Sequence, residues 1–380
     1  MEIPFFNYKK YCEDLNYIGL IKEVLKSGYL IGGPYLEELE NNMQSFTGIK
    51  HCIGVGNATD AMEIIFQFLN LEKNSRVLVP AHTMLATASA AKNAGLIPVP
   101  VDVSQSSLML EFEQLKDCNL SNVSACMITQ LNGVVADMDP IKEFCQKKNI
   151  ALVEDSAQGI GAFNDNKHAG SWGIGGCLSF YPAKVAGGIG DGGALITNND
   201  LLADYARSVR DHGRGEEFEA INWGRNSRLD SINARVIIER LKNLDSLINK
   251  RRNLAEIYDK NLKDLQDQNL IKLPPKFSTN SKSKSTYQNY EIQAKSRNKL
   301  IQFLNDQNVG TIKQWGGFSI AHFSKLGFNI KDYPKTEILF EKLLLLPINH
   351  MMKEKEVEYI CNLINIFYKK IIVSNFYSED

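Results

Sequence analysis

Three things are scarce in this sequence: long hydrophobic runs, net charge of either sign, and closely spaced cysteines. No apolar run approaches the roughly 18 residues that a membrane-spanning helix needs, which argues against a membrane protein. Lysine and arginine together number 43, and aspartate and glutamate 44, so the formal net charge is −1. A chain without a global positive field is not expected to bind nucleic acid or an anionic membrane surface.

The seven cysteines form no recognisable disulfide or zinc-binding pattern. Their number is odd, no Cys-x-x-Cys pair occurs, and no histidine lies at a spacing typical of zinc ligands. We therefore expect reduced thiols and no bound metal ion. The first residues, Met1 to Phe6, show neither the basic nor the apolar part of a signal or transit peptide. These observations predict a cytoplasmic protein.

The composition that remains is that of a globular protein with an alternating pattern of strands and helices. Hydrophobic residues make up 44% of the 380 residues and charged residues 23%, which excludes intrinsic disorder. Short β-rich apolar runs cover residues 52–55, 77–80, 97–103, 125–129, 151–155, 177–181 and 194–197. Helix-like stretches between them cover residues 60–69, 84–94, 138–148 and 201–210. The alternation predicts an α/β domain with a mostly parallel sheet and helices on its faces.

The pattern changes after residue 230. Residues 232–262 are charged and helix-periodic, which predicts one long connecting helix, and the Pro-, Ser- and Lys-rich stretch 274–285 predicts a loop. A further strand is expected at 289–294 and further helices at 298–308 and 354–368, with an apolar run at 343–348. We therefore divide the chain into a large domain, residues 1–245, which includes an N-terminal segment, and a small C-terminal α+β domain, residues 246–380.

Residues suited to chemistry follow the predicted strands, and parallel α/β sheets bind ligands at the carboxyl ends of their strands. Gly56-Asn57-Ala58-Thr59-Asp60 opens a helix, so its backbone N–H groups could hold an anion such as a phosphate. The same residues also suit an ordinary helix cap. His82 follows another strand, but without a second ligand at metal spacing it favours a structural role.

Two further strand ends carry charged side chains. Asp155 lies within Glu154-Asp155-Ser156-Ala157-Gln158 and could be a metal ligand, a catalytic acid or base, the partner of a protonated ring nitrogen, or a cap. Lys184 ends Ser179-Phe180-Tyr181-Pro182-Ala183-Lys184 and precedes a glycine-rich stretch. It is a candidate nucleophilic amine whose desolvation would lower its pKa, although a plain loop lysine stays an alternative. The glycines follow the lysine, so the P-loop order is absent.

A phosphate cradle, an acid for a ring nitrogen and a lysine able to form a Schiff base are together what pyridoxal phosphate requires. From about Leu25 to Tyr368, the sequence resembles the DegT/StrS-type sugar aminotransferases, which are fold-type I pyridoxal phosphate enzymes. The motifs named above carry the resemblance, together with Ser27-Gly28-Tyr29, Gly32-Gly33-Pro34, Pro80-Ala81-His82-Thr83, Ala136-Asp137-Met138-Asp139, Gly190-Asp191-Gly192-Gly193-Ala194, His212-Gly213 and Gly224-Arg225-Asn226-Ser227-Arg228-Leu229-Asp230.

This resemblance implies a fold and a set of roles. The large domain would hold a seven-stranded, mostly parallel sheet sandwiched by helices. Lys184 would form the Schiff base with pyridoxal 5'-phosphate and serve as the base for proton transfer. Asp155 would pair with the pyridine nitrogen, and Gln158 would approach the phenolic oxygen of the ring.

The remaining implied roles concern the phosphate and the ring face. Ala58, Thr59 and Ser179 would hold the phosphate. Asn226 matches a position that reaches the phosphate of the neighbouring subunit, which implies a homodimer with shared active sites. Met84 stands where the family usually stacks an aromatic ring on the cofactor, and its thioether can still pack on a π face.

The implied activity is amino transfer from L-glutamate to the keto group of a nucleotide-linked sugar, with pyridoxamine 5'-phosphate formed between the two halves. Such a reaction serves amino-sugar biosynthesis, for lipopolysaccharide or another polysaccharide. The stretch Gly187-Gly188-Ile189-Gly190-Asp191-Gly192-Gly193 resembles relatives that aminate C3, which predicts a dTDP- or UDP-linked 3-keto sugar. Transfer to C4 is the alternative, because the loops at 130–133 and 218–220 depart from the family's usual residues.

Two other readings remain. A pyridoxamine-dependent sugar dehydratase of this family would carry histidine in place of Lys184. A non-catalytic binding or regulatory protein could keep the fold, but the intact set of Lys184, Asp155, Ser179 and Asn226 argues against it.

Overall fold

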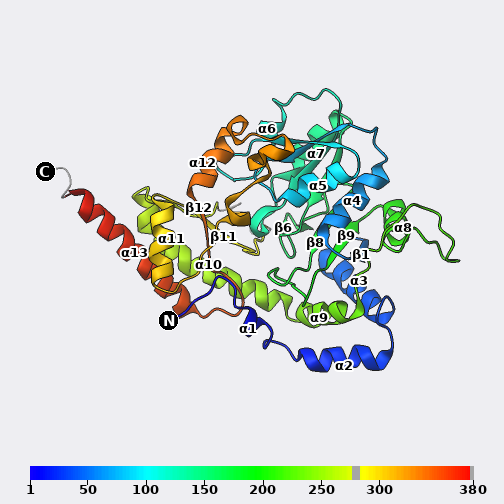
Figure 1. Ribbon diagram of the computed structural model, residues 1–380, viewed down its shortest axis with the longest axis horizontal. Helices are drawn as coiled ribbons and strands as arrows, with labels where there is room; N and C mark the ends of the chain where they lie inside the picture. Colours follow the sequence, from blue (N-terminus) through cyan, green and yellow to red (C-terminus); the bar gives the residue numbers. More distant parts are fainter. Residues whose placement is uncertain (276–282, 377–380) are drawn as a thin grey trace.

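The computed structural model describes residues 1–275 and 283–376, with side chains up to residue 370. Its centre is a seven-stranded sheet in the order β1-β9-β8-β5-β4-β2-β3 (Figure 1). The strands are β1 His51–Val55, β2 Arg76–Pro80, β3 Ile97–Val101, β4 Val123–Thr129, β5 Ala151–Asp155, β8 Gly175–Ser179 and β9 Gly193–Thr197. Only the two pairs made by β9 are antiparallel. The predicted sheet is confirmed, and every predicted run contributes a strand.

Helices cover both faces of this sheet. Neighbouring residues of a strand point to opposite faces, and Val77 and Val79 accordingly join one hydrophobic cluster while Leu78 joins another. The first cluster includes residues of α4 Ala58–Leu69, α5 Leu85–Asn93 and α8 Asp200–Val209. The second includes residues of α6 Phe112–Leu115 and α7 Met138–Lys147. A third cluster joins α3 Pro34–Thr47 to α9 Ser231–Leu241 at the β1 end.

The expected long helix at 232–262 is wrong in one respect, because the chain forms two helices there. Helix α9 ends at Leu241, and α10 Leu244–Asp267 begins after Asn243, whose N–H bonds the Arg240 carbonyl at 3.1 Å. Leu244 is buried in the same cluster as Leu241. The apolar pattern therefore continues across the break, and no glycine or proline marks it.

The C-terminal part contains a three-stranded antiparallel sheet in the order β10-β11-β12. Its strands are β10 Ile271–Lys272, β11 Tyr290–Ala294 and β12 Leu343–Leu346, and α10, α11 Arg297–Asp306 and α13 Glu354–Phe376 lie beside it (Figure 1). Part of the predicted loop, residues 276–282, lies outside the described residues. The division of the chain at residue 245, which α10 crosses, stays a prediction.

A segment of the C-terminal part returns to the large sheet. It holds α12 Pro334–Lys342 and the 3-10 turns η2 Gln314–Gly317, η3 Ile320–His322, η4 Ser324–Leu326 and η5 Ile330–Asp332. Ile320 is buried in the same cluster as Val77, and the rings of Trp315 and Phe340 lie 5.4 and 5.3 Å from that of His82. The sequence pattern did not indicate this return.

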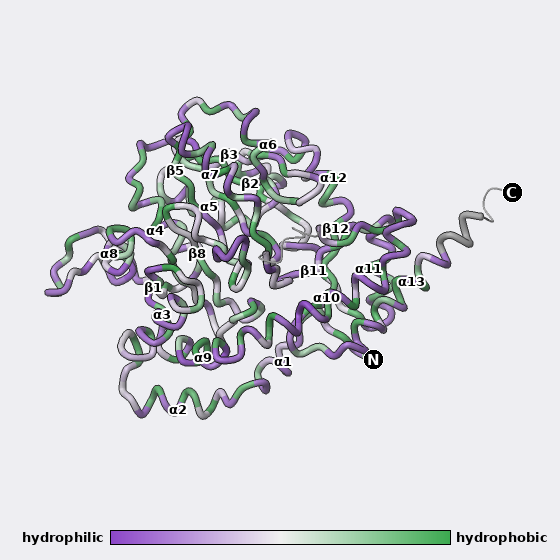
Figure 2. The backbone as a smooth tube through the Cα atoms, turned by 180° about the vertical axis from the view of Figure 1, so that it is seen from behind, coloured by the Kyte–Doolittle hydropathy of each residue, from purple (hydrophilic) through white to green (hydrophobic). Residues whose placement is uncertain are grey.

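The N-terminal segment crosses between the two parts of the chain. It contains α1 Tyr8–Tyr11 and α2 Tyr17–Ser27, and α2 lies beside α9 (Figure 1). Figure 2 shows hydrophobic and hydrophilic stretches alternating along α2. At its start, Ile3 pairs with Val309 through hydrogen bonds to neighbouring backbone groups at 2.9 and 2.8 Å. The short hairpin β6 Phe163–Asn164 and β7 Lys167–His168 and the turn η1 Leu131–Gly133 complete the elements.

Candidate active site

Lys184 lies just past the buried strand β8, in a run of turns before β9. The residue is partly accessible, but its amine is desolvated, and this burial lowers the pKa of Lys184. The carboxylate of Asp155 opposes this shift of the Lys184 pKa, and Asp155 pairs with Cys177 on β8, the strand that leads to Lys184. A lysine with a lowered pKa is more often neutral and is therefore a better nucleophile and base.

Asp155 ends strand β5 with only 5% of its surface exposed. The Thr87 hydroxyl donates to its Oδ2 at 2.6 Å, and the Ala157 N–H donates to its Oδ1 at 3.2 Å. Thr87 in turn lies 2.7 Å from the Thr83 hydroxyl. These bonds fix the orientation of the carboxylate. Sequence reasoning missed Thr87, whose only signal is a hydroxyl on the sheet-facing side of an alanine-rich helix.

The two neighbouring acids of the Glu154-Asp155 pair have different surroundings. Glu154 points away from the site into the fold, where the N–H groups of Gly170, Trp172 and Gly173 donate to it at 2.6–3.0 Å. Burial raises the pKa of Glu154, and these bonds oppose that shift. Glu154 therefore holds a turn, which leaves Asp155 as the candidate acid of the site. Among the described residues, no group of three or more His, Cys, Asp or Glu side chains could hold a metal ion.

The start of α4 supports both roles considered for Gly56-Asn57-Ala58-Thr59-Asp60. The Asn57 side chain caps the helix by accepting from the Asp60 N–H at 2.9 Å. The N–H groups of the first helical turn still have no acceptor within the helix. Ser179 pairs with Gly193 on β9, and a Cβ on Gly193 would lie 2.5 Å from the Ala58 nitrogen. The lack of a side chain at Gly193 thus brings Ser179 beside the helix start.

Gln158 is joined to the loop at 130–133. Its Oε1 accepts from the Asn132 N–H at 2.7 Å, while the Asn132 side chain bonds Glu291 and Asn289 of the C-terminal part at 2.9 and 2.8 Å. Gln130 is fully buried and donates to Glu154 at 2.7 Å. The unusual residue at Gln130 therefore has a structural role. Asn132, in contrast, bonds Gln158, which is a predicted contact of the cofactor.

His82 and Met84 lie at the β2 end of the site. His82 is buried, and its Nδ1 lies 2.9 Å from the Leu108 carbonyl oxygen, which supports the structural role expected for it. Met84 is exposed at the start of α5, where its sulfur accepts from the Ala86 N–H at 3.0 Å. Because α5 also carries Thr87, Met84 lies on the same helix as the group that orients Asp155.

Asn226 is an exposed residue of the 210–228 loop. It pairs with Asp211, and the Arg228 Nε donates to its side chain at 3.1 Å. The next residue, Ser227, bonds Gly56 and Asp60 at the start of α4 at 3.0 and 2.6 Å. Asn226 therefore lies on a surface beside the helix start.

The chain matches the sequence profile of the DegT/DnrJ/EryC1/StrS aminotransferase family over residues 12–365. It is 30% identical over 375 residues to the pleiotropic regulatory protein of Geobacillus stearothermophilus, and the aligned part covers 97% of this chain and 99% of that protein. It is 29% identical over 356 residues to the dTDP-3-amino-3,4,6-trideoxy-alpha-D-glucose transaminase of Micromonospora megalomicea subsp. nigra, with 92% and 94% covered. A solved structure of S. venezuelae DesV in complex with a ketimine intermediate superposes with a TM-score of 0.90 at 28% identity, with 96% and 98% covered.

Proposed function

Because the chain belongs to the DegT/DnrJ/EryC1/StrS aminotransferase family and is therefore a pyridoxal phosphate-dependent transaminase, we propose that it moves an amino group from L-glutamate to a keto-sugar nucleotide. The observation that carries this proposal is that the buried strands β5 and β8 pair at Asp155 and Cys177, and that β8 leads directly to the desolvated amine of Lys184. Pyridoxal phosphate, when bound, supplies an aldehyde for condensation with amines and a ring that accepts electrons.

The described residues fit this cofactor. The close approach at Gly193, which a Cβ would block, brings the Ser179 hydroxyl beside the N–H groups at Ala58 and Thr59, and these groups would together hold its phosphate. Asp155 is held rigidly enough to keep a proton on the ring nitrogen, and Gln158 would face the phenolic oxygen.

Lys184 would act twice in this chemistry. Its neutral amine would hold the cofactor through the aldehyde carbon, with loss of water, and the donor amine would displace it. The freed amine would then act as the base that carries a proton from the donor Cα to the former aldehyde carbon on the other side of the nitrogen, a role that requires a lowered pKa and hydrogen-bond reach. Borohydride reduction followed by peptide mapping tests this role directly. Label on another lysine, or on none, would overturn it.

For the acceptor, we propose a 3-keto sugar linked to dTDP or UDP, in the biosynthesis of an amino sugar of lipopolysaccharide or another polysaccharide. The Gly187–Gly193 sequence supports C3, as does the activity for which the Micromonospora relative is named, which concerns a dTDP-linked 3-amino sugar. A matched pair of 3-keto and 4-keto substrates, with the product analysed by NMR, decides the position. Nitrogen found only at C4 would refute C3 and leave the transaminase assignment intact.

A homodimer with shared active sites is the proposed assembly. Large apolar side chains of the 210–228 loop are exposed, with Trp223 at 98% exposure and Phe218 and Ile221 also exposed, and such groups are typical of interfaces. Asn226 lies on this loop and would reach the partner's phosphate. Mixing Asn226→Ala chains with Lys184→Ala chains should restore activity in one of the two sites. No rescue in verified heterodimers would place the phosphate contacts within one subunit.

We place the enzyme in the cytoplasm, where unpaired thiols persist. All seven cysteines are free thiols. No helix in the described ranges is both long enough and apolar enough to cross a membrane.

A regulatory role is the second candidate, because one relative is named a pleiotropic regulatory protein. A regulator has no need of a desolvated Lys184 amine beside an oriented carboxylate, so the site favours the enzyme. Purified protein without bound cofactor and without amino transfer would favour the regulator.

A further inference from the structure

The backbone of Lys184 is not held by a helix or a strand. Residues 181–190 form successive turns, in which the Lys184 N–H bonds the Tyr181 carbonyl at 2.8 Å and the Gly187 N–H bonds the Lys184 carbonyl at 3.0 Å. Local turns of this kind are easily distorted unless other groups support them. The structure supplies that support from two segments distant in sequence.

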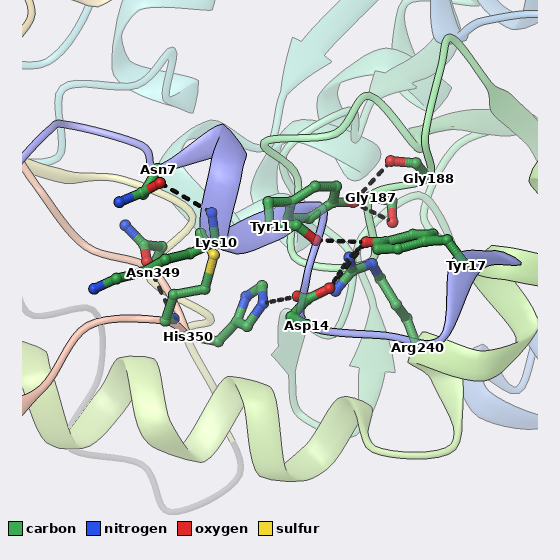
Figure 3. A network of polar contacts seen from close by, with 11 residues as sticks. Asn7, Lys10, Tyr11, Asp14, Tyr17, Gly187, Gly188, Arg240, Asn349 and His350 are labelled. Atoms are coloured by element: carbon green, nitrogen blue, oxygen red, sulfur yellow. Dashed lines mark hydrogen bonds and ion pairs between the residues drawn. The ribbon is translucent and has the colours of Figure 1, made fainter.

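Tyr11 of the N-terminal segment supports the glycine side of the turn. Its hydroxyl oxygen lies 2.7 Å from the carbonyl oxygens of both Gly187 and Gly188, and its single proton is shared between them (Figure 3). Tyr11 is 2% exposed, so water cannot readily replace this donor. Because the Gly187 N–H bonds the Lys184 carbonyl, holding Gly187 in place also restrains the backbone of Lys184.

Tyr11 is itself held by a network that Figure 3 shows. The Arg240 guanidinium lies 4.1 Å from the centre of the Tyr11 ring and makes two hydrogen bonds of 3.0 Å to Asp14. The Tyr17 hydroxyl donates to the Tyr11 carbonyl at 2.8 Å, and His350 lies 2.8 Å from Asp14. Residues of α2, α9 and the C-terminal part thus fix the place of one hydroxyl group.

Gln288 supports the other side of Lys184. Its Oε1 accepts from the Val185 N–H at 3.0 Å, and its Nε2 donates to the Ala183 carbonyl at 3.0 Å. One amide side chain therefore bonds the residues immediately before and after Lys184. Gln288 is 8% exposed and lies just before β11 in the C-terminal part.

We propose that Tyr11 and Gln288 are positioning residues of the transamination reaction, which fix the Lys184 backbone so that its amine returns to one place after each release. This inference rests on the proposed role of Lys184. A lysine side chain has four flexible carbons, so the position of its Cα limits where the amine can reach. A displacement of about 1 Å in such a group can cost roughly 10²-fold in rate.

The test uses the full-length holoenzyme with Tyr11→Phe and Gln288→Met. Each variant should lower kcat for the glutamate half-reaction roughly tenfold with KM nearly unchanged, and should shift the pH at which the visible band of the Lys184 Schiff base titrates. In the cofactor-free protein, hydrogen exchange of the backbone amides at Val185 and Gly187 should become faster. This last measurement does not depend on activity.

Tyr368→Phe is the matched control. The Tyr368 hydroxyl is a buried donor to the Lys295 carbonyl at 2.8 Å, in the C-terminal part away from Lys184. The control should lose stability as Tyr11→Phe does but keep its kcat, its spectral titration and the exchange at Val185. If the Tyr11 and Gln288 variants behave like the control, the positioning role is refuted.

Two further measurements separate the possible failures. Gln288→Glu preserves the acceptor for Val185 and can donate to Ala183 only while its carboxyl is protonated, so its kcat should fall with rising pH more steeply than that of the parent. An unchanged pH profile would overturn the role of Gln288 even if Gln288→Met does not fold. Absence of borohydride label on Lys184 in the parent enzyme would refute the proposed function, whereas normal label with unchanged exchange in Tyr11→Phe would refute only the positioning.

Discussion

The two charged ends of the site are supported in different ways. Asp155 ends a strand inside the large sheet and is oriented by Thr87, which is buried on α5, and by Ala157, which packs against the core on that side. Lys184 lies in turns whose supports, Tyr11 and Gln288, are more than a hundred residues away from it in the sequence, one before it and one after it. The carboxylate has one fixed task in the proposed reaction, whereas the amine must leave and return. A group that stays in place can rely on the sheet, but a group that moves needs a backbone held from outside.

Separate substitutions of the two neighbouring acids, Asp155 and Glu154, should give the largest effects and test this comparison most strongly. Asp155→Asn should reduce amino transfer by on the order of 10²- to 10³-fold with little change in stability, because it removes the charge opposite the ring nitrogen. Glu154→Gln should instead lower the free energy of unfolding by about 2 kcal/mol, because three backbone N–H groups lose a charged acceptor. Single-turnover kinetics and urea unfolding of both variants check the two outcomes. Equal losses of activity and of stability in the two variants would contradict the different roles assigned to Asp155 and Glu154.

Weakening the support of Asp155 should have a smaller effect. Thr87→Val keeps the shape of the side chain and removes the 2.6 Å bond to the carboxylate. We expect transfer to slow roughly tenfold, since a hydrogen bond to a charged group contributes about 1.5–3 kcal/mol. Thr83→Val, one step further from Asp155, is the matched comparison and should cost less. A larger loss of activity in Thr83→Val than in Thr87→Val would contradict the order of hydrogen bonds from Thr83 through Thr87 to Asp155.

The network behind Tyr11 predicts a pH dependence of stability. Although burial acts to raise it, hydrogen bonds from His350 and Arg240 hold the pKa of Asp14 at about 2, below its ordinary value. The unfolded chain therefore binds a proton at this group at higher pH than the folded chain does. The stabilisation, about 1–2 kcal/mol after solvent screening, is present above pH 4 and is lost as the pH falls toward 2.

Asp14→Asn isolates this contribution. The difference in free energy of unfolding between the parent and the variant should be full at pH 6 and should shrink between about pH 4 and pH 2. Urea unfolding across that range measures it. A difference that is constant with pH would show that the charge of Asp14 is not what stabilises the network.

The smallest expected effect concerns Met84, which would pack on a face of the cofactor ring. Met84→Phe should tighten binding of pyridoxal phosphate by about three- to tenfold, because aromatic stacking contributes about 0.5–1.5 kcal/mol. Equilibrium dialysis of the cofactor-free protein gives the dissociation constants. Met84→Leu controls for bulk without a ring, and equal tightening by both would rule out stacking.

The elements that the sequence predicted best are those with local signals. Each of the seven strands contains a short run rich in apolar residues, and Asp155 and Lys184 lie at or just past the ends of two of those strands. The division of one expected helix into α9 and α10 had no such signal, because the apolar positions run through it.

Residues that support the site from a distance were not predictable from local pattern. A tyrosine at position 11 and a glutamine at position 288 are ordinary in their own segments, and their roles depend on contacts across more than a hundred residues. Gln130 shows the converse, since it departs from the family's usual residue in a loop considered for the choice of acceptor, but is buried against Glu154. Long-range contacts decide both cases.

The pairing of Ile3 with Val309 has a consequence for synthesis of the protein. Ile3 leaves the ribosome long before Val309 and cannot reach its final place until Val309 has emerged, and the contact between Asp14 and His350 forms later still. The large sheet can assemble before that point, since its strands end at Thr197. The network that supports the Lys184 turn is therefore complete only after residue 350 has been made. A chain truncated before His350 would contain Lys184 and Asp155 without the complete network that positions Lys184.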